Sequence, residues 1–303
     1  MKALVTGGAG FIGSHLADAL RLGGAEVHII DNLSSGLREQ VHPSARLHEE
    51  DITGETISDL IQAIRPDVLF HLAAQIDVQS SIANPAQDSN TNVVGTLRIL
   101  QACKQSGVRK LVFSSTSAVY GEGSQYPKDE SMATSPISFY GLSKDTAEKS
   151  IRLFHHLSGL PYTILRYSNV YGPRQTSRGE GGVISVFMNK LKQNLPLTVH
   201  GTGEQTRDFI YVQDIVEANL AAVRKGDGQT VNISTGRRTS INQLVDLLKR
   251  IHGPELGVEH SPARAGDIRD SCLDNRLAER VLAWSPRSSL IEGLKQTYRS
   301  ILT

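Results

Sequence analysis

The sequence contains little cysteine, no long apolar run and no excess of charge of either sign. Its 303 residues include two cysteines, Cys103 and Cys272, which lie far apart and lack the spacing of metal ligands. This pattern argues against a disulfide scaffold and favours a reducing, cytoplasmic location. The formal net charge is +1 and there is no basic block, so nucleic acid is not an expected partner.

Signals for a membrane or a metal are also missing. No apolar run approaches the length that spans a bilayer, and no signal peptide is recognisable before the first strand-like segment, so we expect no membrane partner. Ten histidines are scattered along the chain, and none forms a His-x-x-x-His pair with an intervening Glu. His155 and His156 are adjacent on a predicted helix and point in different directions. We expect no metal site.

The first half of the chain alternates regularly between short apolar strands and helices. Strands are predicted in "KALVT", "EVHIID", "DVLFHLAA", "KLVFSS" and "YTILRYSNVYG", with helices between them. Right-handed crossovers then give an α/β fold, a Rossmann-type doubly wound parallel sheet covered on both faces. After a loop at "GPRQTSRGEGG", short strands and helices predict a smaller C-terminal α/β lobe. We expect a nucleotide-binding domain over residues 1–170, to which 205–235 returns, a second lobe over 171–303, and a ligand cleft between them.

A glycine-rich turn links the first predicted strand to the first helix. In "LVTGGAGFIGSHLADAL", Gly7 permits a tight turn, Gly10 lets the backbone approach a pyrophosphate, and Gly13 lets helix and strand pack closely. The N–H groups at the start of the helix would face the anion. The alternative is a glycine-rich turn without a ligand. The strand–turn–helix context favours dinucleotide binding.

Two carboxylates follow the next two predicted strands. Asp31 ends the second strand about twenty residues after the turn, where a carboxylate accepts hydrogen bonds from the adenosine ribose. It would repel a 2′-phosphate, and Asn32 rather than an arginine follows it, which favours NAD over NADP. Asp31 can also cap a turn, and the two roles do not exclude each other. Asp51 could meet the adenine edge or cap the next helix, and the sequence does not decide between these roles.

A tyrosine and a lysine lie one helical turn apart in "SFYGLSKDTAEK". Tyr140 and Lys144 are predicted on the same face of a helix. By composition, a Tyr-x-x-x-Lys match arises by chance about once in three or four chains of this kind, so the pair alone could be part of an exposed helix face.

Together, "TGGAGFIGS", "DNLSSG", "SSTSAVYG", "YGLSK" and "LRYSNVYGPRQ" closely resemble the extended short-chain dehydrogenase/reductase family, and within it the UDP-glucose 4-epimerases. The resemblance runs the full length, through "QTRDFIYVQDIV" to "RAGDIRDSCLD". It is specific for fold and for NAD as cofactor, and less specific for the sugar.

The resemblance also gives Tyr140 and Lys144 a role: Tyr140 is implied as the catalytic acid/base, and Lys144 as a ligand of the nicotinamide ribose. A free phenol titrates near ~10, and a nearby ammonium lowers its pKa towards neutrality.

The same resemblance implies the remaining site. Thr116 would hydrogen-bond the reacting sugar oxygen, although a Ser/Thr-rich strand end also commonly caps a turn. Ala73 and Ala74 would let the dinucleotide lie close, Asn92 would support the strand geometry, and Tyr167 would lie near the nicotinamide. The full set of expected cofactor contacts is Gly7, Gly10, Phe11, Ile12, Gly13, Asp31, Asn32, Ser35, Gly36, Asp51, Ile52, Leu72, Ala73, Ala74, Asn92, Ser114, Tyr140, Lys144 and Tyr167.

The residues after Thr116 bear on the reaction. Relatives that dehydrate hexoses carry an Asp–Glu pair there, and UDP-glucuronate decarboxylases tend to carry a Glu, whereas this chain has Ser117 and Ala118. This argues for 4-epimerisation, in which hydride leaves C4 for NAD and returns to the other face of the sugar. Two other classes stay open, a net dehydrogenase or reductase and a non-catalytic NAD-binding sensor.

The implied substrate is a UDP-sugar. Arginine suits the diphosphate because its planar fork binds phosphate oxygens in pairs. Ser271 aligns with a wall residue that is bulky in some epimerases, and a small residue there leaves room for a 2-acetamido group. UDP-N-acetylglucosamine is therefore a candidate beside UDP-glucose, while "RQTSRGEGGVISVF" resembles the glucose/galactose group more than the uronic-acid group. The expected substrate contacts are Thr116, Asn169, Val183, Thr198, Val199, His200, Arg207, Arg264, Asp267 and Ser271.

The predicted helices around residues 87–106 and 139–158 have apolar positions on more than one face. Relatives pair these helices into an intersubunit four-helix bundle, so the resemblance implies a homodimer.

Overall fold

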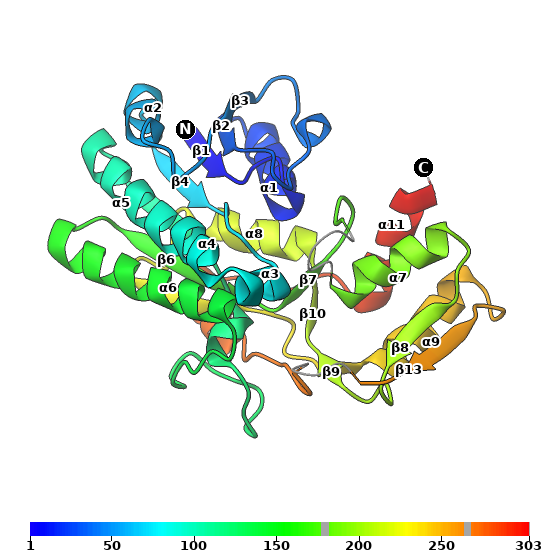
Figure 1. Cartoon of the computed structure of the whole chain (residues 1–303). Helices are drawn as coiled ribbons and strands as arrows, with labels where there is room; N and C mark the ends of the chain where they lie inside the picture. Colours follow the sequence, from blue (N-terminus) through cyan, green and yellow to red (C-terminus); the bar gives the residue numbers. More distant parts are fainter. Residues whose placement is uncertain (177–181, 264–267, 303) are drawn as a thin grey trace.

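A computed structural model describes residues 1–176, 182–263 and 268–302. The larger of its two lobes is built on a seven-stranded parallel sheet, and the smaller lobe lies beyond the carboxyl ends of the strands (Figure 1). In spatial order the strands of this sheet are β11 (Gln229–Ile233), β6 (Tyr162–Tyr167), β5 (Lys110–Thr116), β4 (Val68–His71), β1 (Lys2–Thr6), β2 (Glu26–Asp31) and β3 (Arg46–Glu49). The predicted doubly wound parallel sheet is confirmed.

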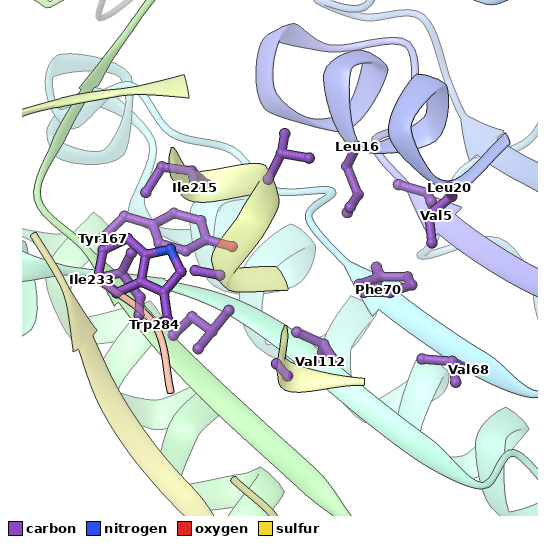
Figure 2. Close-up of a cluster of buried hydrophobic side chains, with 14 of the residues drawn as sticks. Val5, Leu16, Leu20, Val68, Phe70, Val112, Tyr167, Ile215, Ile233 and Trp284 are labelled. Atoms are coloured by element: carbon purple, nitrogen blue, oxygen red, sulfur yellow. The ribbon is translucent and has the colours of Figure 1, made fainter. Parts of the chain in front are cut away.

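Helices cover both faces of the sheet. One face carries α1 (Phe11–Leu22), α8 (Val212–Ala222) and α10 (Arg276–Leu282), and the other carries α2 (Ile57–Ile64), α5 (Gly95–Ser106) and α6 (Phe139–Ser158). Figure 2 shows the first of these two cores, where side chains from β1, β4 and β5 meet those of α1 and α8. Both faces of each central strand are therefore buried, which is why these strands are apolar almost throughout.

The smaller lobe has its own core. Its helices are α7 (Val183–Lys192), α9 (Ile241–His252) and α11 (Leu290–Leu302), and its strands form the pairs β7 (Asn169–Tyr171) with β10 (Phe209–Tyr211), β8 (Leu197–His200) with β13 (Val258–Ser261), and β9 (Thr206–Arg207) with β12 (Thr239–Ser240). Strand β11 pairs with β6, and α8 lies against α1. The segment 205–235 therefore contributes to both lobes, and the exact domain division stays a prediction.

Two expected elements differ from the prediction. The single strand expected in "YTILRYSNVYG" breaks at Ser168, because the chain leaves β6 there and Asn169 begins β7 in another sheet. The helix expected over residues 87–106 consists of α4 (Pro85–Ser89), a π-helical turn (Asn90–Val94) and α5. A π turn widens a helix locally and re-aims its side chains, which the apolar pattern does not encode.

A buried ion pair joins α6 to the sheet. Glu148 on α6 accepts hydrogen bonds from Arg166 Nε (2.9 Å) and Nη2 (2.6 Å) on β6, and from Ser115 Oγ (2.5 Å) on β5. Burial alone would lower the pKa of Arg166, but its hydrogen bonds to Glu148 raise that pKa above its usual value. The pair fixes α6 against β5 and β6, because bidentate contact with three protein donors leaves the carboxylate little freedom.

We predict that Arg166→Met lowers the free energy of unfolding by about 3–5 kcal/mol at neutral pH, because it leaves the Glu148 carboxylate buried without its main partner. Arg152→Met is the matched control, since Arg152 also contacts Glu148 (3.2 Å) but its side chain is 36% exposed, and it should cost about 1 kcal/mol or less. Urea denaturation measures both. Equal losses for the two variants would contradict the structural role of the pair.

Candidate active site

The order of the strands reverses between β1 and β4, and this is where open α/β sheets bind ligands. The glycine turn follows β1, Asp31 ends β2, Ala73 and Ala74 follow β4, and Thr116 ends β5. All strands of this sheet are parallel, so these residues gather at one edge.

The glycine turn has the shape that a dinucleotide pyrophosphate requires. Gly7 has φ +70°, and a Cβ there would lie 2.8 Å from the backbone nitrogen of Ala73. A Cβ on Gly13 would lie 2.1 Å from the carbonyl oxygen of Gly7, so α1 sits directly on the turn. Gly10 provides no side-chain cap for α1. The backbone N–H groups of Phe11 and Ile12 lie in the first turn of this helix, where N–H groups have no carbonyl partner within the helix. The turn therefore fits an anion at the start of α1.

Asp31 shapes the turn that follows β2. Its carboxylate accepts from the backbone N–H groups of Ala9 (2.9 Å) and Leu33 (2.9 Å). A Cβ on Gly36 would lie 2.8 Å from Asp31 Oδ1, so a glycine is needed there. The turn-capping role is confirmed, and the ribose contact stays a prediction. Ser35 beside it is exposed.

Asp51 closes a turn and does not cap a helix. It accepts from the backbone N–H (2.7 Å) and hydroxyl (2.6 Å) of Thr53, whereas the residue before α2 is Thr56. The helix-capping alternative is therefore wrong. Asn32 donates to Asp51 (2.7 Å), which ties together the ends of β2 and β3. Burial raises the pKa of Asp51, but these hydrogen bonds outweigh it and the pKa lies below its usual value.

Several expected cofactor contacts are core side chains. Ile52 is buried beneath α5, so only its backbone can face a ligand. Tyr167 is buried in the cluster of Figure 2, and Asn219 Nδ2 lies 2.8 Å from its hydroxyl. β6 directs the Tyr167 side chain towards α8, and the expectation that Tyr167 lies near the nicotinamide stays a prediction. Burial raises the pKa of Tyr167 above its usual value.

Asn92 supports a loop and not a strand. Its side chain lies on the π turn and pairs with the backbone of Gln75, accepting from N–H (2.9 Å) and donating to C=O (2.9 Å). Gln75 follows Leu72, Ala73 and Ala74, which are all partly exposed at the end of β4. Asn92 itself is buried. It therefore positions the loop on which the expected cofactor contacts lie.

Lys144 is a buried cation at the end of β5. Its ammonium donates to the carbonyl oxygen of Ser114 (2.9 Å) and lies 4.7 Å from the ring centre of Phe113. Burial lowers the pKa of Lys144 to about 8, although Asp88 and Glu148 oppose this effect. The contact to Ser114 is through its backbone.

Tyr140 and Thr116 complete the expected trio. Tyr140 is half-buried in the first turn of α6, which begins at a Ser138 cap whose hydroxyl accepts from the Gly141 N–H (3.1 Å). Thr116 is half-buried, and its hydroxyl accepts from the Ala118 N–H (3.1 Å), so the turn-capping role is present. A hydroxyl that accepts from an amide still has its own hydrogen to donate.

Substrate-side residues come from the smaller lobe. Ser271 lines a cavity together with Ser117, which follows Thr116, and with Tyr126 and Lys128. Its N–H donates to Thr206 O (3.1 Å). Ser271 therefore lies near the end of β5, where Thr116 is expected to act.

The other expected substrate contacts differ from one another in burial and in hydrogen-bond partners. Asn169 has a buried Oδ1 without a hydrogen-bond partner among the residues described, and Arg207 Nη1 donates to Thr206 O (2.9 Å). Val199 is a core residue, so its side chain is not available to substrate. Val183 begins α7, Thr198 accepts from Lys190, and His200 Nδ1 lies 2.6 Å from the Ser261 hydroxyl. Arg264 and Asp267 lie outside the described residues.

The sequence reasoning missed a contact that bridges the two lobes. Arg238 forms an ion pair with Asp270 (2.6 Å) and stacks over the ring of Tyr126 (5.6 Å to the centroid), while Thr206 donates to Asp270 (2.5 Å). These residues precede or surround Ser271. No local sequence pattern marks these residues, because their contacts join segments that are distant in the sequence and come from different lobes.

Comparison of the sequence with known proteins agrees with a dinucleotide-binding site at this edge of the sheet. The model of the NAD dependent epimerase/dehydratase family matches residues 3–234. The chain belongs to this family. A UDP-glucose 4-epimerase from Mycolicibacterium smegmatis is 39% identical over 98% of this chain and 97% of that protein.

Two solved structures extend the comparison. The UDP-glucose 4-epimerase of Thermotoga maritima, determined with UDP-glucose, is 44% identical with a TM-score of 0.96 and coverage of 100% and 99%. The UDP-N-acetylglucosamine 4-epimerase of Methanobrevibacter ruminantium, in complex with UDP-N-acetylmuramic acid, is 34% identical with a TM-score of 0.95 and coverage of 99% and 98%. The predictions of the family, of an enzyme and of NAD as its cofactor are confirmed. In the described residues, no helix is long and apolar enough to cross a membrane.

Proposed function

We propose that the protein interconverts UDP-glucose and UDP-galactose by NAD-dependent epimerisation at C4. The observation that carries this proposal is the convergence at one sheet edge of the glycine turn and the trio Thr116, Tyr140 and Lys144. Family membership and the named epimerases among its relatives support UDP-sugar 4-epimerisation as the reaction class. The identity of the sugar is the finer part of the proposal.

Each residue has a definite task in this reaction. NAD, when bound, would supply the hydride acceptor and donor that epimerisation at C4 requires. Tyr140 takes the proton of the C4 hydroxyl and later gives it back, and the nearby Lys144 charge favours the phenolate. Thr116 donates a hydrogen bond to the reacting oxygen. Neither Ser117 nor Ala118 provides a carboxylate for elimination or decarboxylation.

The cofactor side is consistent with NAD. The first turn of α1 would hold the pyrophosphate, and the Asp31 carboxylate would accept from the adenosine ribose and repel a 2′-phosphate. Lys144 would hold the nicotinamide ribose at the end of β5.

The two free cysteines are buried, and a cytoplasmic location stays a prediction.

UDP-N-acetylglucosamine is the second candidate substrate. Ser271 contributes only a hydroxymethyl group to the wall that it shares with Ser117, and the family resemblance implies that a small residue at this position admits a 2-acetamido group. A relative that is 34% identical is a UDP-N-acetylglucosamine 4-epimerase.

We predict that purified protein converts UDP-glucose to its C4 epimer without added reductant, as followed by proton NMR, and that Tyr140→Phe lowers kcat by at least roughly 100-fold because the acid/base is lost. UDP-N-acetylglucosamine and UDP-glucuronate are tested in separate tubes. Conversion of one of these two sugars, but not of UDP-glucose, would reassign the substrate. No conversion of any sugar by protein that binds NAD would favour a net redox reaction or a sensor.

We predict that Ser271→Tyr excludes a 2-acetamido sugar while sparing UDP-glucose, because a phenol ring fills the space beside Ser117. The ratio of kcat/KM for UDP-N-acetylglucosamine over UDP-glucose should fall by at least roughly tenfold. Ser44→Tyr is the control, since Ser44 is exposed in the turn before β3, outside this cavity. An unchanged ratio in Ser271→Tyr would remove this wall from the specificity argument.

We also propose a homodimer through α5 and α6. These helices pack side by side (Figure 1), and α6 carries an apolar stripe at helical spacing that includes Leu142 (48% exposed), Leu153 (59%) and Leu157 (73%). An exposed apolar stripe of this kind is typical of a helix that packs against a partner. A second copy of the same helix pair would cover it.

We predict that Leu153→Glu weakens dimerisation at least ~100-fold, which corresponds to about 3 kcal/mol, because it places a charge within an apolar interface. Light scattering coupled to gel filtration measures the mass. Leu22→Glu is the control, because Leu22 is also exposed but ends α1 on the other side of the sheet. A monomeric wild-type protein would rule out the dimer.

A further inference from the structure

The Lys144 ammonium is enclosed by protein. Its side chain is 3% exposed, and the contacts described above are a carbonyl oxygen and an aromatic ring, neither of which carries a full negative charge. Removing a cation from water is costly unless a counter-charge lies nearby. The fold must therefore place a carboxylate close to Lys144.

Glu148 cannot meet this need fully. It lies one helical turn after Lys144, but its oxygens are occupied by Arg166 and Ser115, and Arg152 contacts it as well. Two guanidinium groups share this one carboxylate, so the cluster carries net positive charge.

Asp88 on α4 is the better placed carboxylate. It is 1% exposed, and the donors to its Oδ1 among the described residues are neutral amides, Gln75 Nε2 (2.9 Å) and Asn92 Nδ2 (3.2 Å). Its Oδ2 is buried and has no hydrogen-bond partner in the described parts of the chain. Asn92 Nδ2 also lies 3.0 Å from Ser143 Oγ, and Ser143 immediately precedes Lys144. A buried carboxylate without a contacting cation thus faces the helix that carries a buried ammonium.

We propose that Asp88 is the counter-charge of Lys144, a positioning residue that keeps the ammonium protonated while Tyr140 exchanges its proton with the sugar. The catalytic part of this inference rests on the proposed function. The electrostatic pairing of Asp88 with Lys144 does not, and can be measured separately.

The titration behaviour agrees with the geometry. Burial lowers the pKa of Lys144 to about 8, and Asp88 is the stronger of the two carboxylates that oppose this effect. The remaining titratable neighbours are His71 on β4, whose pKa is lowered to about 3 by burial and by the Lys144 charge, and Tyr140. His71 is neutral at the pH of catalysis. Loss of the negative charge at Asp88 would lower the pKa of Lys144 further, so the ammonium would deprotonate at lower pH.

The test uses Asp88→Asn, which keeps the acceptor oxygen for Gln75 and Asn92 but removes the charge. Asp145→Asn is the matched control: Asp145, on α6, is also buried and has one oxygen without a partner among the described residues, but its ion pair is with Lys149 (2.6 Å). Lysine labelled with ¹³C at Cε reports the titration of Lys144, assigned with Lys144→Arg. The pH dependence of kcat is measured on the same proteins.

We expect the Lys144 midpoint, and with it the basic limb of kcat, to fall by about one pH unit in Asp88→Asn. Above that midpoint kcat should drop roughly tenfold, with KM within about twofold of wild type, because Asp88 does not touch substrate. Asp145→Asn should titrate like wild type. If Asp88→Asn does not fold, Asp88→Ser removes the same charge.

An unchanged Lys144 midpoint with only a lower Tm would overturn the proposal and leave Asp88 as a loop support. A shifted midpoint in a protein that epimerises no sugar would support the pairing and count against the proposed function. The two failures are therefore distinguishable.

Discussion

The burial of one positive charge, on Lys144, is the constraint on which the rest of this active site depends. An ammonium in that position requires α6 to lie against the carboxyl end of β5, where the Ser114 carbonyl accepts from it. The Glu148–Arg166 pair makes that placement rigid, because it ties α6 to β5 and β6 one helical turn further along. Tyr140 lies one helical turn before Lys144 on α6, so holding the helix also holds the backbone of Tyr140 in place.

This arrangement places the structural Glu148–Arg166 pair close to Lys144, the charge proposed to act in catalysis. Ser115 and Arg166 face each other across β5 and β6, and the neighbouring register pair is Thr116 with Tyr167. Side chains alternate along a strand, so Ser115 and Arg166 both point to Glu148, whereas in the next pair Thr116 lies at the strand end and Tyr167 enters the opposite core. A change in the ion pair would therefore shift catalytic geometry as well as stability.

The local parts of this site could be predicted from the sequence, and the parts that depend on distant partners could not. The glycine turn, the end of β2 at Asp31 and the Tyr140–Lys144 spacing follow from rules that act within a few residues. The burial of the Tyr167 side chain against α8 could not be predicted, because strand periodicity does not say which face of β6 meets that helix. Asn92 was linked to a strand because its partner, Gln75, is seventeen positions away. Asp88 carried no signal, since a single acid at a helix start is usually exposed.

The same distinction explains why the sugar is harder to identify than the reaction. The residues proposed for the chemistry lie on one lobe, on β5 and α6, whereas the wall proposed for the sugar is made where two lobes meet. Ser271 is held through the Thr206 backbone, and Thr206 through Asp270 and Arg238, which stacks on Tyr126 from the other lobe. Substitutions at any of these positions could move the wall without touching the catalytic trio. Specificity can therefore diverge among relatives that keep the same reaction, which fits the different sugars named for two neighbours of almost equal structural similarity.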